Sequence, residues 1–175
     1  MKKQKQMDLA FDNYLTVSKI LREDIIKLLS QREETDQWQR RFIKELTITC
    51  EAFSACYRGI LEIDKDGYEN KLSKNQLTVL EDERSLSTDD RLKYTLTGIH
   101  KVLSLEPIPN FGQPLWESAR KAILKRDQLT HPKDISSLLL ETRDFEEYEE
   151  GLTWLYEQHS NVLSLIQEKH KSLIK

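Results

Sequence analysis

The stretch PLWESARKAILKRDQLTHP, residues 114–132, carries the pattern that decides the fold of this chain. On a helix with about 100° between successive residues, its apolar side chains gather on one arc and most of its polar side chains on the opposite one. Pro132 disfavours helical geometry in the residue before it, so we expect the helix to end at about Thr130. The stretch therefore predicts a helix over 114–130 with one buried face. That face consists of Leu115, Trp116, Ala119, Ala122, Ile123, Leu129 and Thr130, and the solvent face of Glu117, Lys121, Lys125 and Gln128.

Helical periodicity recurs on both sides of this stretch. Either Thr35 or Asp36 is expected to cap one helix, Gly67 to end it, and Ser87 or Thr88 to cap the next. No segment shows the sustained alternation of a strand, and 5 Gly and 4 Pro in 175 residues are too few for many short strands. The sequence predicts an all-α bundle of four to five main helices in a single domain, residues 1–175. The other expected helices cover residues 8–31, 36–67, 75–80, 88–105 and 142–171.

Charge and hydropathy limit the classes of protein to which the chain can belong. With 27 basic and 30 acidic residues, the formal net charge is -3, which excludes an overall basic nucleic-acid coat. No apolar run is long enough to cross a bilayer, and no signal-peptide core follows the N-terminal lysines, so we expect a cytoplasmic protein without membrane contact. Cys50 and Cys56 lie on different sides of a helix and are expected to be reduced core residues. No residues have metal-ligand spacing, so no metal or cofactor is expected.

One residue interrupts the apolar arc of the 114–130 helix. Arg126 falls in its middle, where an unpaired guanidinium would be strongly unfavourable, so it needs a partner or a wet crevice. One explanation is structural: Arg126 pairs with a glutamate of a neighbouring helix, such as Glu51, and His131 only caps the helix. The other is chemical: a cation, the Asp127 carboxylate and an imidazole gathered within about one and a half turns suit acid–base work on a phosphodiester.

The string RDQLTHPK, from Arg126 to Lys133, resembles the signature of the HEPN superfamily, the higher eukaryotes and prokaryotes nucleotide-binding domains. That signature is an arginine, often followed by Asn, Asp or His, and then a histidine after four to six intervening residues. Here Asp127 stands in the preferred polar position, and a THPK ending is common in bacterial members. The expected helical bundle, with the motif late in a helix that precedes a long C-terminal helix, is also similar to the family fold.

The resemblance implies a function and a role for each motif residue. Many HEPN proteins are metal-independent endoribonucleases in which two chains bring two motifs into one cleft. Arg126 would stabilise charge on the scissile phosphate, His131 would act as general acid or base during attack by the RNA 2′-hydroxyl, and Asp127 would orient one of them. We therefore expect a homodimer through the motif helix and an RNA substrate. We also expect a toxin or defence effector with a protein antitoxin or other partner. Lys133 departs from family toxins whose tyrosine at that position is modified by a nucleotidyltransferase.

Other interpretations belong to different classes of protein. Some HEPN members have lost activity and serve as scaffolds, so the chain could be a non-catalytic interaction module, and a third interpretation is a helical partner subunit of a larger enzyme. The basic residues Lys121, Lys125 and Lys133 could guide RNA to the motif or form a solvated helix face.

The remaining aromatic and imidazole side chains are assigned to the core and the surface. The three tryptophans lie on apolar stripes and are expected in the core or at a dimer seam. The histidines His100, His159 and His170 have no metal-ligand spacing and are expected at the surface.

Overall fold

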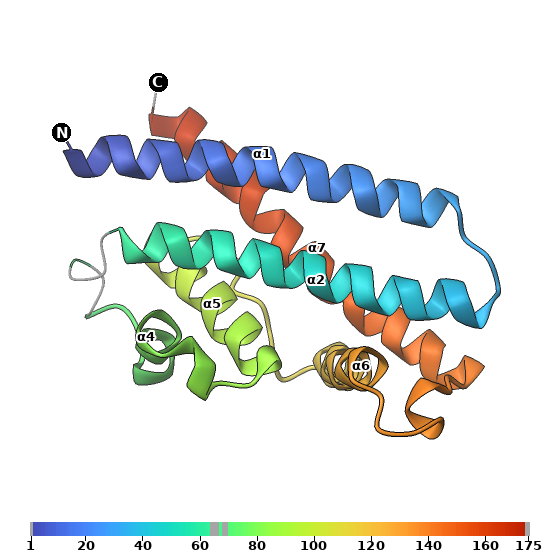
Figure 1. Cartoon of the computed structure of the whole chain (residues 1–175). Helices are drawn as coiled ribbons and strands as arrows, with labels where there is room; N and C mark the ends of the chain where they lie inside the picture. The colour runs from blue at the N-terminus through green and yellow to red at the C-terminus, as the bar shows by residue number, and fades with distance from the viewer. Residues whose placement is uncertain (1, 64–66, 68–69, 174–175) are drawn as a thin grey trace.

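The helix α2, Asp36–Glu62, lies at the centre of the computed structural model, which describes residues 2–63, 67 and 70–173. The helices that contact it are α1 (Lys2–Ser30), α4 (Lys74–Glu81), α5 (Thr88–Leu103), α6 (Pro114–Thr130) and α7 (Thr142–Leu173). Figure 1 shows α1 running antiparallel to α2, α7 crossing behind both, and α4, α5 and α6 on the other side of α2. The described residues thus form an all-helical bundle, as predicted. None of their helices combines the length and the apolar character that a membrane span requires.

Local signals set most of the helix ends. The Thr35 hydroxyl caps α2 by accepting the backbone N–H of Trp38 at 3.2 Å, and Ser87 caps α5 in the same way. Pro114 occupies the first turn of α6, where its missing N–H costs nothing. These starts confirm the sequence prediction. The predicted end at Gly67 is wrong, because α2 ends at Glu62, directly after its last buried residue, Leu61.

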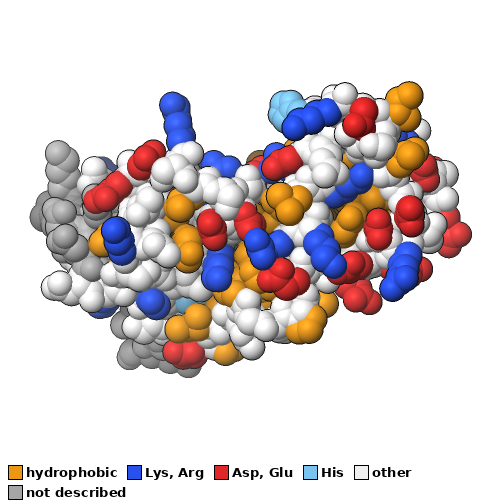
Figure 2. Space-filling model, turned by 90° about the horizontal axis from the view of Figure 1, so that it is seen from below, with side chains coloured by type: hydrophobic (Ala, Val, Ile, Leu, Met, Phe, Trp, Pro, Cys, Tyr) orange, Lys and Arg blue, Asp and Glu red, His pale blue; other side chains and the backbone are white. Residues whose placement is uncertain are grey.

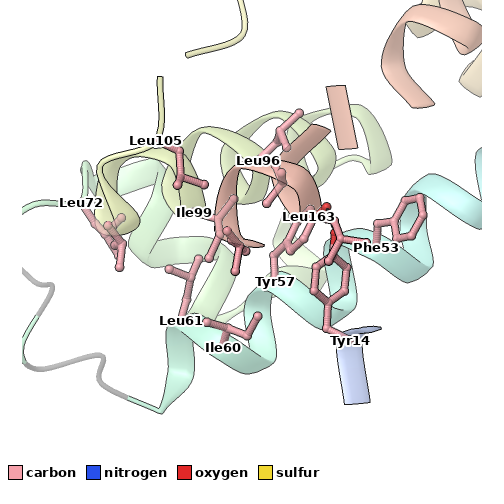
Figure 3. Packing of buried hydrophobic residues seen from close by; sticks show 13 residues of the cluster. Tyr14, Phe53, Tyr57, Ile60, Leu61, Leu72, Leu96, Ile99, Leu105 and Leu163 are labelled. Carbon is pink, nitrogen blue, oxygen red and sulfur yellow. Dashed lines mark hydrogen bonds between the residues drawn. The ribbon is translucent and has the colours of Figure 1, made fainter. Parts of the chain in front are cut away.

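The largest core cluster draws side chains from α1, α2, α5 and α7 (Figure 3). Tyr14 of α1 donates its hydroxyl proton to Tyr57 of α2 across 2.7 Å, because the Tyr57 hydroxyl itself donates to the carbonyl oxygen of His159 across 2.5 Å. Burial raises the pKa of Tyr14 to about 12, so both hydroxyls keep their protons at neutral pH. This chain of hydrogen bonds connects three helices through the interior.

Two histidines correct the expectation of surface imidazoles. His159 is 0% exposed, and its ring stacks on that of Tyr57 with centroids 5.6 Å apart. His100 is also buried, and its Nδ1 lies 3.1 Å from the carbonyl oxygen of Leu105. Their polar sequence neighbours suggested solvent, but α2 covers α7 at His159, whose ring stacks on those of Phe53 and Tyr57. The expectation for His170 falls on a side chain outside those the structure describes.

The tryptophans and cysteines follow the prediction more closely. The three tryptophans are all buried, Trp38 in one cluster and Trp116 and Trp154 in another. The two cysteines are free thiols, of which Cys50 is buried and Cys56 half-buried. Both tryptophan clusters include residues of α6 and α7, so the core extends directly beneath the motif helix.

Candidate functional site

The motif helix α6 lies against α2 and α7 through the predicted apolar arc. Buried residues of this arc are Trp116, Ala119, Ala122, Ile123 and Leu129. Thr130, the last residue of the helix, is exposed, contrary to expectation. On α7, a Cβ added to Gly151 would lie 2.2 Å from the backbone nitrogen of Ala119. The two backbones are therefore in direct contact, which fixes the position of α6.

The Arg126 guanidinium is held by two carboxylates. Its Nη2 donates to Oε1 of Glu51 on α2, and its Nη1 lies 3.1 Å from Oδ1 of Asp127. The Arg126 side chain is 16% exposed, and its buried Nε has no hydrogen-bond partner among the described residues. The structural explanation of this cation predicted a glutamate partner such as Glu51, and this contact is present.

His131 stands at the other end of the motif. Its backbone N–H donates to the carbonyl oxygen of Asp127 across 2.9 Å, and its φ of -127° and ψ of 67° take the chain out of the helix before Pro132. The residue is exposed, and no hydrogen bond of its ring is found within the described chain. The imidazole is therefore accessible from solvent, while its backbone is fixed by the helix end.

A surface cavity of about 570 Å³ opens beside His131. Its lining consists of Asp127, Gln128, His131, Lys133, Asp134 and Ser137. Arg126 does not line it, because its guanidinium points to α2 and Glu51. Asp127 thus contacts the Arg126 guanidinium and also lines the same cavity as His131. The structure does not bring Arg126 and His131 to a common cavity within one chain.

The three lysines of the expected RNA-binding set differ in their surroundings. Lys121 pairs with Glu147 across 2.7 Å, and Lys125 donates from Nζ to the carbonyl oxygens of Ser137 at 3.2 Å and Leu139 at 2.6 Å. Lys133 is exposed and lines the cavity. Of the three, Lys133 is thus the one that faces the space beside His131.

Asp134 organises the loop after the motif and was not singled out by the sequence. Its Oδ1 accepts hydrogen bonds from the Ser136 hydroxyl at 2.6 Å and from the backbone N–H of Ser137 at 2.9 Å. These hydrogen bonds hold the pKa of Asp134 below its usual value, so the carboxylate is ionised at neutral pH. An aspartate followed by serines two and three residues later is a recognisable loop signature.

Charge around the motif is mixed rather than uniformly basic. Figure 2, which views the molecule from the side of α4, α5 and α6, shows basic and acidic side chains interspersed over this face. In the described part of the chain, no group of three or more His, Cys, Asp or Glu side chains could hold a metal ion. The arrangement offers an accessible imidazole, two carboxylates and one free amine.

Comparison with known protein families, curated proteins and solved structures finds no match to this chain.

Proposed function

We propose that this chain is a metal-independent endoribonuclease of HEPN type, which acts as a homodimer in the cytoplasm as a toxin or defence effector. The observation that supports the proposal is the position of His131, an exposed imidazole in a surface cavity next to Asp127. Asp127 in turn contacts the Arg126 guanidinium. A general acid or base needs a side chain that the substrate can reach and a backbone that holds it in place. The His131 ring is exposed, and its backbone N–H is hydrogen-bonded to Asp127.

The proposed reaction uses the RNA 2′-hydroxyl as the nucleophile. It attacks the adjacent phosphorus while the bond to the 5′-oxygen breaks, which leaves a 2′,3′-cyclic phosphate and a 5′-hydroxyl. His131 takes the proton of the 2′-hydroxyl or supplies one to the leaving oxygen, and in a dimer the two copies divide these roles. Arg126 donates to the phosphate oxygens in exchange for Glu51, and Asp127 orients the guanidinium.

A dimer seam along the motif helix is supported by apolar exposure. Leu124 on α6 is 58% exposed, and Ile135 and Leu139 in the following loop are 80% and 61% exposed. Lys125 holds this loop to α6 through the carbonyl oxygen of Leu139, so these side chains belong to one region of the surface. A second copy or a protein antitoxin that covered them would remove this apolar area from water.

Cleavage of RNA by the purified protein in EDTA tests the proposal. We expect products ending in a 2′,3′-cyclic phosphate, and a loss of roughly 10²-fold or more in His131→Ala, the usual weight of an acid–base group. Gln128→Ala is the matched control, because Gln128 lines the same cavity without acid–base chemistry. Unchanged cleavage in His131→Ala, or activity only with added Mg²⁺, would overturn the mechanism.

The contact between Arg126 and Glu51 favours a second candidate, a non-catalytic helical interaction module. Under this alternative Arg126 exists to pair α6 with α2. We then expect no RNA cleavage by the parent chain. His131→Ala should leave the stability of the fold unchanged, whereas Arg126→Ala should lower it. Cleavage and unfolding measured on the same two variants separate the candidates.

A further inference from the structure

Another surface cavity, of about 330 Å³, lies between the N-terminal half of α1 and the C-terminal half of α7. In Figure 1 these two half-helices lie at the end of the molecule where both chain termini are marked. The volume is at the lower end of the range of about 300–1,000 Å³ that is usual for drug-sized ligands. The lining is mostly apolar or aromatic and consists of Asp8, Phe11, Asp12, Tyr14, Leu15, Leu163 and Ile166.

The floor of this cavity is part of the largest core cluster. Leu163 and Ile166 of α7 are each 7% exposed, and Tyr14 of α1 is 1% exposed. Figure 3 shows the Tyr14 ring pointing from α1 toward Tyr57 and Leu163. A ligand in the cavity would therefore extend the core and remove further apolar surface from water.

The polar groups of the lining accept hydrogen bonds but do not donate them to the cavity. The Tyr14 hydroxyl is used in the interior, where it lies 2.7 Å from the Tyr57 hydroxyl. The remaining polar side chains are carboxylates, which only accept when ionised. None of the described lining residues carries a positive charge. An anionic head group would thus be repelled, which excludes fatty acids and phosphates as ligands.

The charge at the rim instead favours a cation. Asp12 is exposed, and within the described part of the chain its carboxylate has no hydrogen bond or ion pair. Asp8, one helical turn earlier, lines the same edge but has another interaction, so Asp12 is the group that we expect to attract a cation. Aromatic rings such as those on this lining also attract cations through their π faces.

We infer that this cavity binds a lipophilic amine, a molecule with an ammonium group and an aliphatic chain. The chain would lie against Leu163 and Ile166, and the ammonium group would pair with Asp12 at the rim. The cavity shares no lining residue with the one beside His131. The inference therefore holds whether or not the chain cleaves RNA, and His131→Ala should retain amine binding.

Titration with octylammonium chloride at pH 7, below the concentration at which it forms micelles, tests the site by calorimetry and by ¹H–¹⁵N NMR. We expect saturable binding at one site, and we expect hexylammonium to bind roughly tenfold more weakly, the usual weight of two buried methylene groups. Octanoate and 1-octanol have the same chain as octylammonium. Both should bind more weakly, because neither brings a positive charge to Asp12.

Two variants of α1 address the two parts of the ligand. Asp12→Asn should weaken octylammonium binding roughly two- to fivefold, the usual weight of an exposed ion pair, and leave 1-octanol binding unchanged. The exposed Asp24→Asn on the same helix is the matched control. Leu15→Trp should prevent binding of both probes by filling the cavity. Leu29→Trp is its control, because Leu29 is 45% exposed on α1 but does not line the cavity.

Circular dichroism checks that each variant is folded. Three results would overturn the inference. These are the absence of saturable octylammonium binding, parental binding in Leu15→Trp, and binding of octanoate or 1-octanol as tight as that of octylammonium.

Discussion

Arg126 is the single residue at which the structural and catalytic interpretations diverge. It lies on the apolar face of α6, and it contacts Glu51 on α2 and Asp127 on its own helix. As a structural group it neutralises Glu51. As a catalytic group it has to exchange that carboxylate for a phosphate. Both interpretations require the guanidinium, but only the structural one requires the glutamate.

Stability measurements isolate the contact between these two side chains. Arg126→Ala should lower the free energy of unfolding by about 1–3 kcal/mol, because it leaves the partly buried Glu51 carboxylate without its donor. The double variant Arg126→Met/Glu51→Leu should recover most of this loss. Urea denaturation at pH 7 measures both, with the exposed Lys133→Ala as control. Parental stability of Arg126→Ala would show that the contact contributes nothing.

His159 makes the stability depend on pH. Both of its ring nitrogens are buried without hydrogen-bond partners in the described chain, and burial, with His100 nearby, lowers its pKa from 6.5 to about 3. The unfolded chain therefore binds a proton near pH 6.5, whereas the folded chain binds it only near pH 3. The contribution of His159 to stability is complete above pH 6.5. It falls as the pH drops from 6.5 toward 3, by up to about 1.4 kcal/mol per pH unit.

Replacement of this imidazole by an apolar ring should remove that dependence. His159→Phe keeps a ring next to Tyr57 but cannot take up a proton, so its unfolding free energy should fall less between pH 6.5 and 5 than that of the parent. Urea denaturation across this range measures the slope. An unchanged slope in His159→Phe would show that other groups cause the acid sensitivity.

At the level of secondary structure, the crossing of α6 and α7 determines where the motif lies. Gly151 is buried at this crossing, and its missing side chain lets the two backbones touch at Ser118 and Ala119. Gly59, in contrast, lies on α2 with nothing within 4 Å of the position of a Cβ. Replacement of these two glycines by alanine should therefore have opposite effects on stability, although both lie in helices.

Gly151→Ala should destabilise the protein by about 3 kcal/mol or more. The new Cβ would lie 2.2 Å and 2.5 Å from backbone atoms of Ala119 and Ser118, which cannot rotate away, so α6 and α7 would have to separate. Gly59→Ala is the matched control and should raise stability by about 0.5–1 kcal/mol through the helical preference of alanine. Thermal and urea unfolding measure both. Parental stability of Gly151→Ala would contradict this contact between the backbones.

At the level of the whole molecule, one surface cavity lies beside the end of α6 and another lies between α2 and α5. The large apolar side chains at α6 and in the following loop remain uncovered in the single chain. The proposed dimer would cover this surface and bring two copies of His131 together.

Sedimentation velocity at tens of micromolar tests this assembly. We expect a dimer whose interface buries roughly 1,200–2,000 Å², and we expect Leu124→Asp to shift the protein toward monomer by placing a charge in the seam. Ile20→Asp on α1 is the matched control, because that side chain is 54% exposed but α1 lies on the other side of α2 from α6. A monomeric parent protein would rule out the composite cleft.

The sequence by itself determined the features that depend on neighbours along the chain. Thr35, Ser87 and Pro114 mark helix starts through one hydrogen bond or one fixed torsion, and Pro132 ends α6 by restricting the residue before it. Periodicity also placed the tryptophans in the core. Each of these signals acts within a few residues and needs no knowledge of what packs against the helix.

Only the tertiary structure decided the features that depend on residues far apart in the sequence. The end of α2 follows where burial stops, and His159 is covered because α2 crosses the face of α7 that carries it. Glu51 was one of several glutamates that Arg126 could meet, and the folded geometry selected it. Arg58 and Arg91 come together only because α2 lies beside α5. Periodicity shows which face of a helix is apolar, but which helix covers that face is settled by the packing of all of them together.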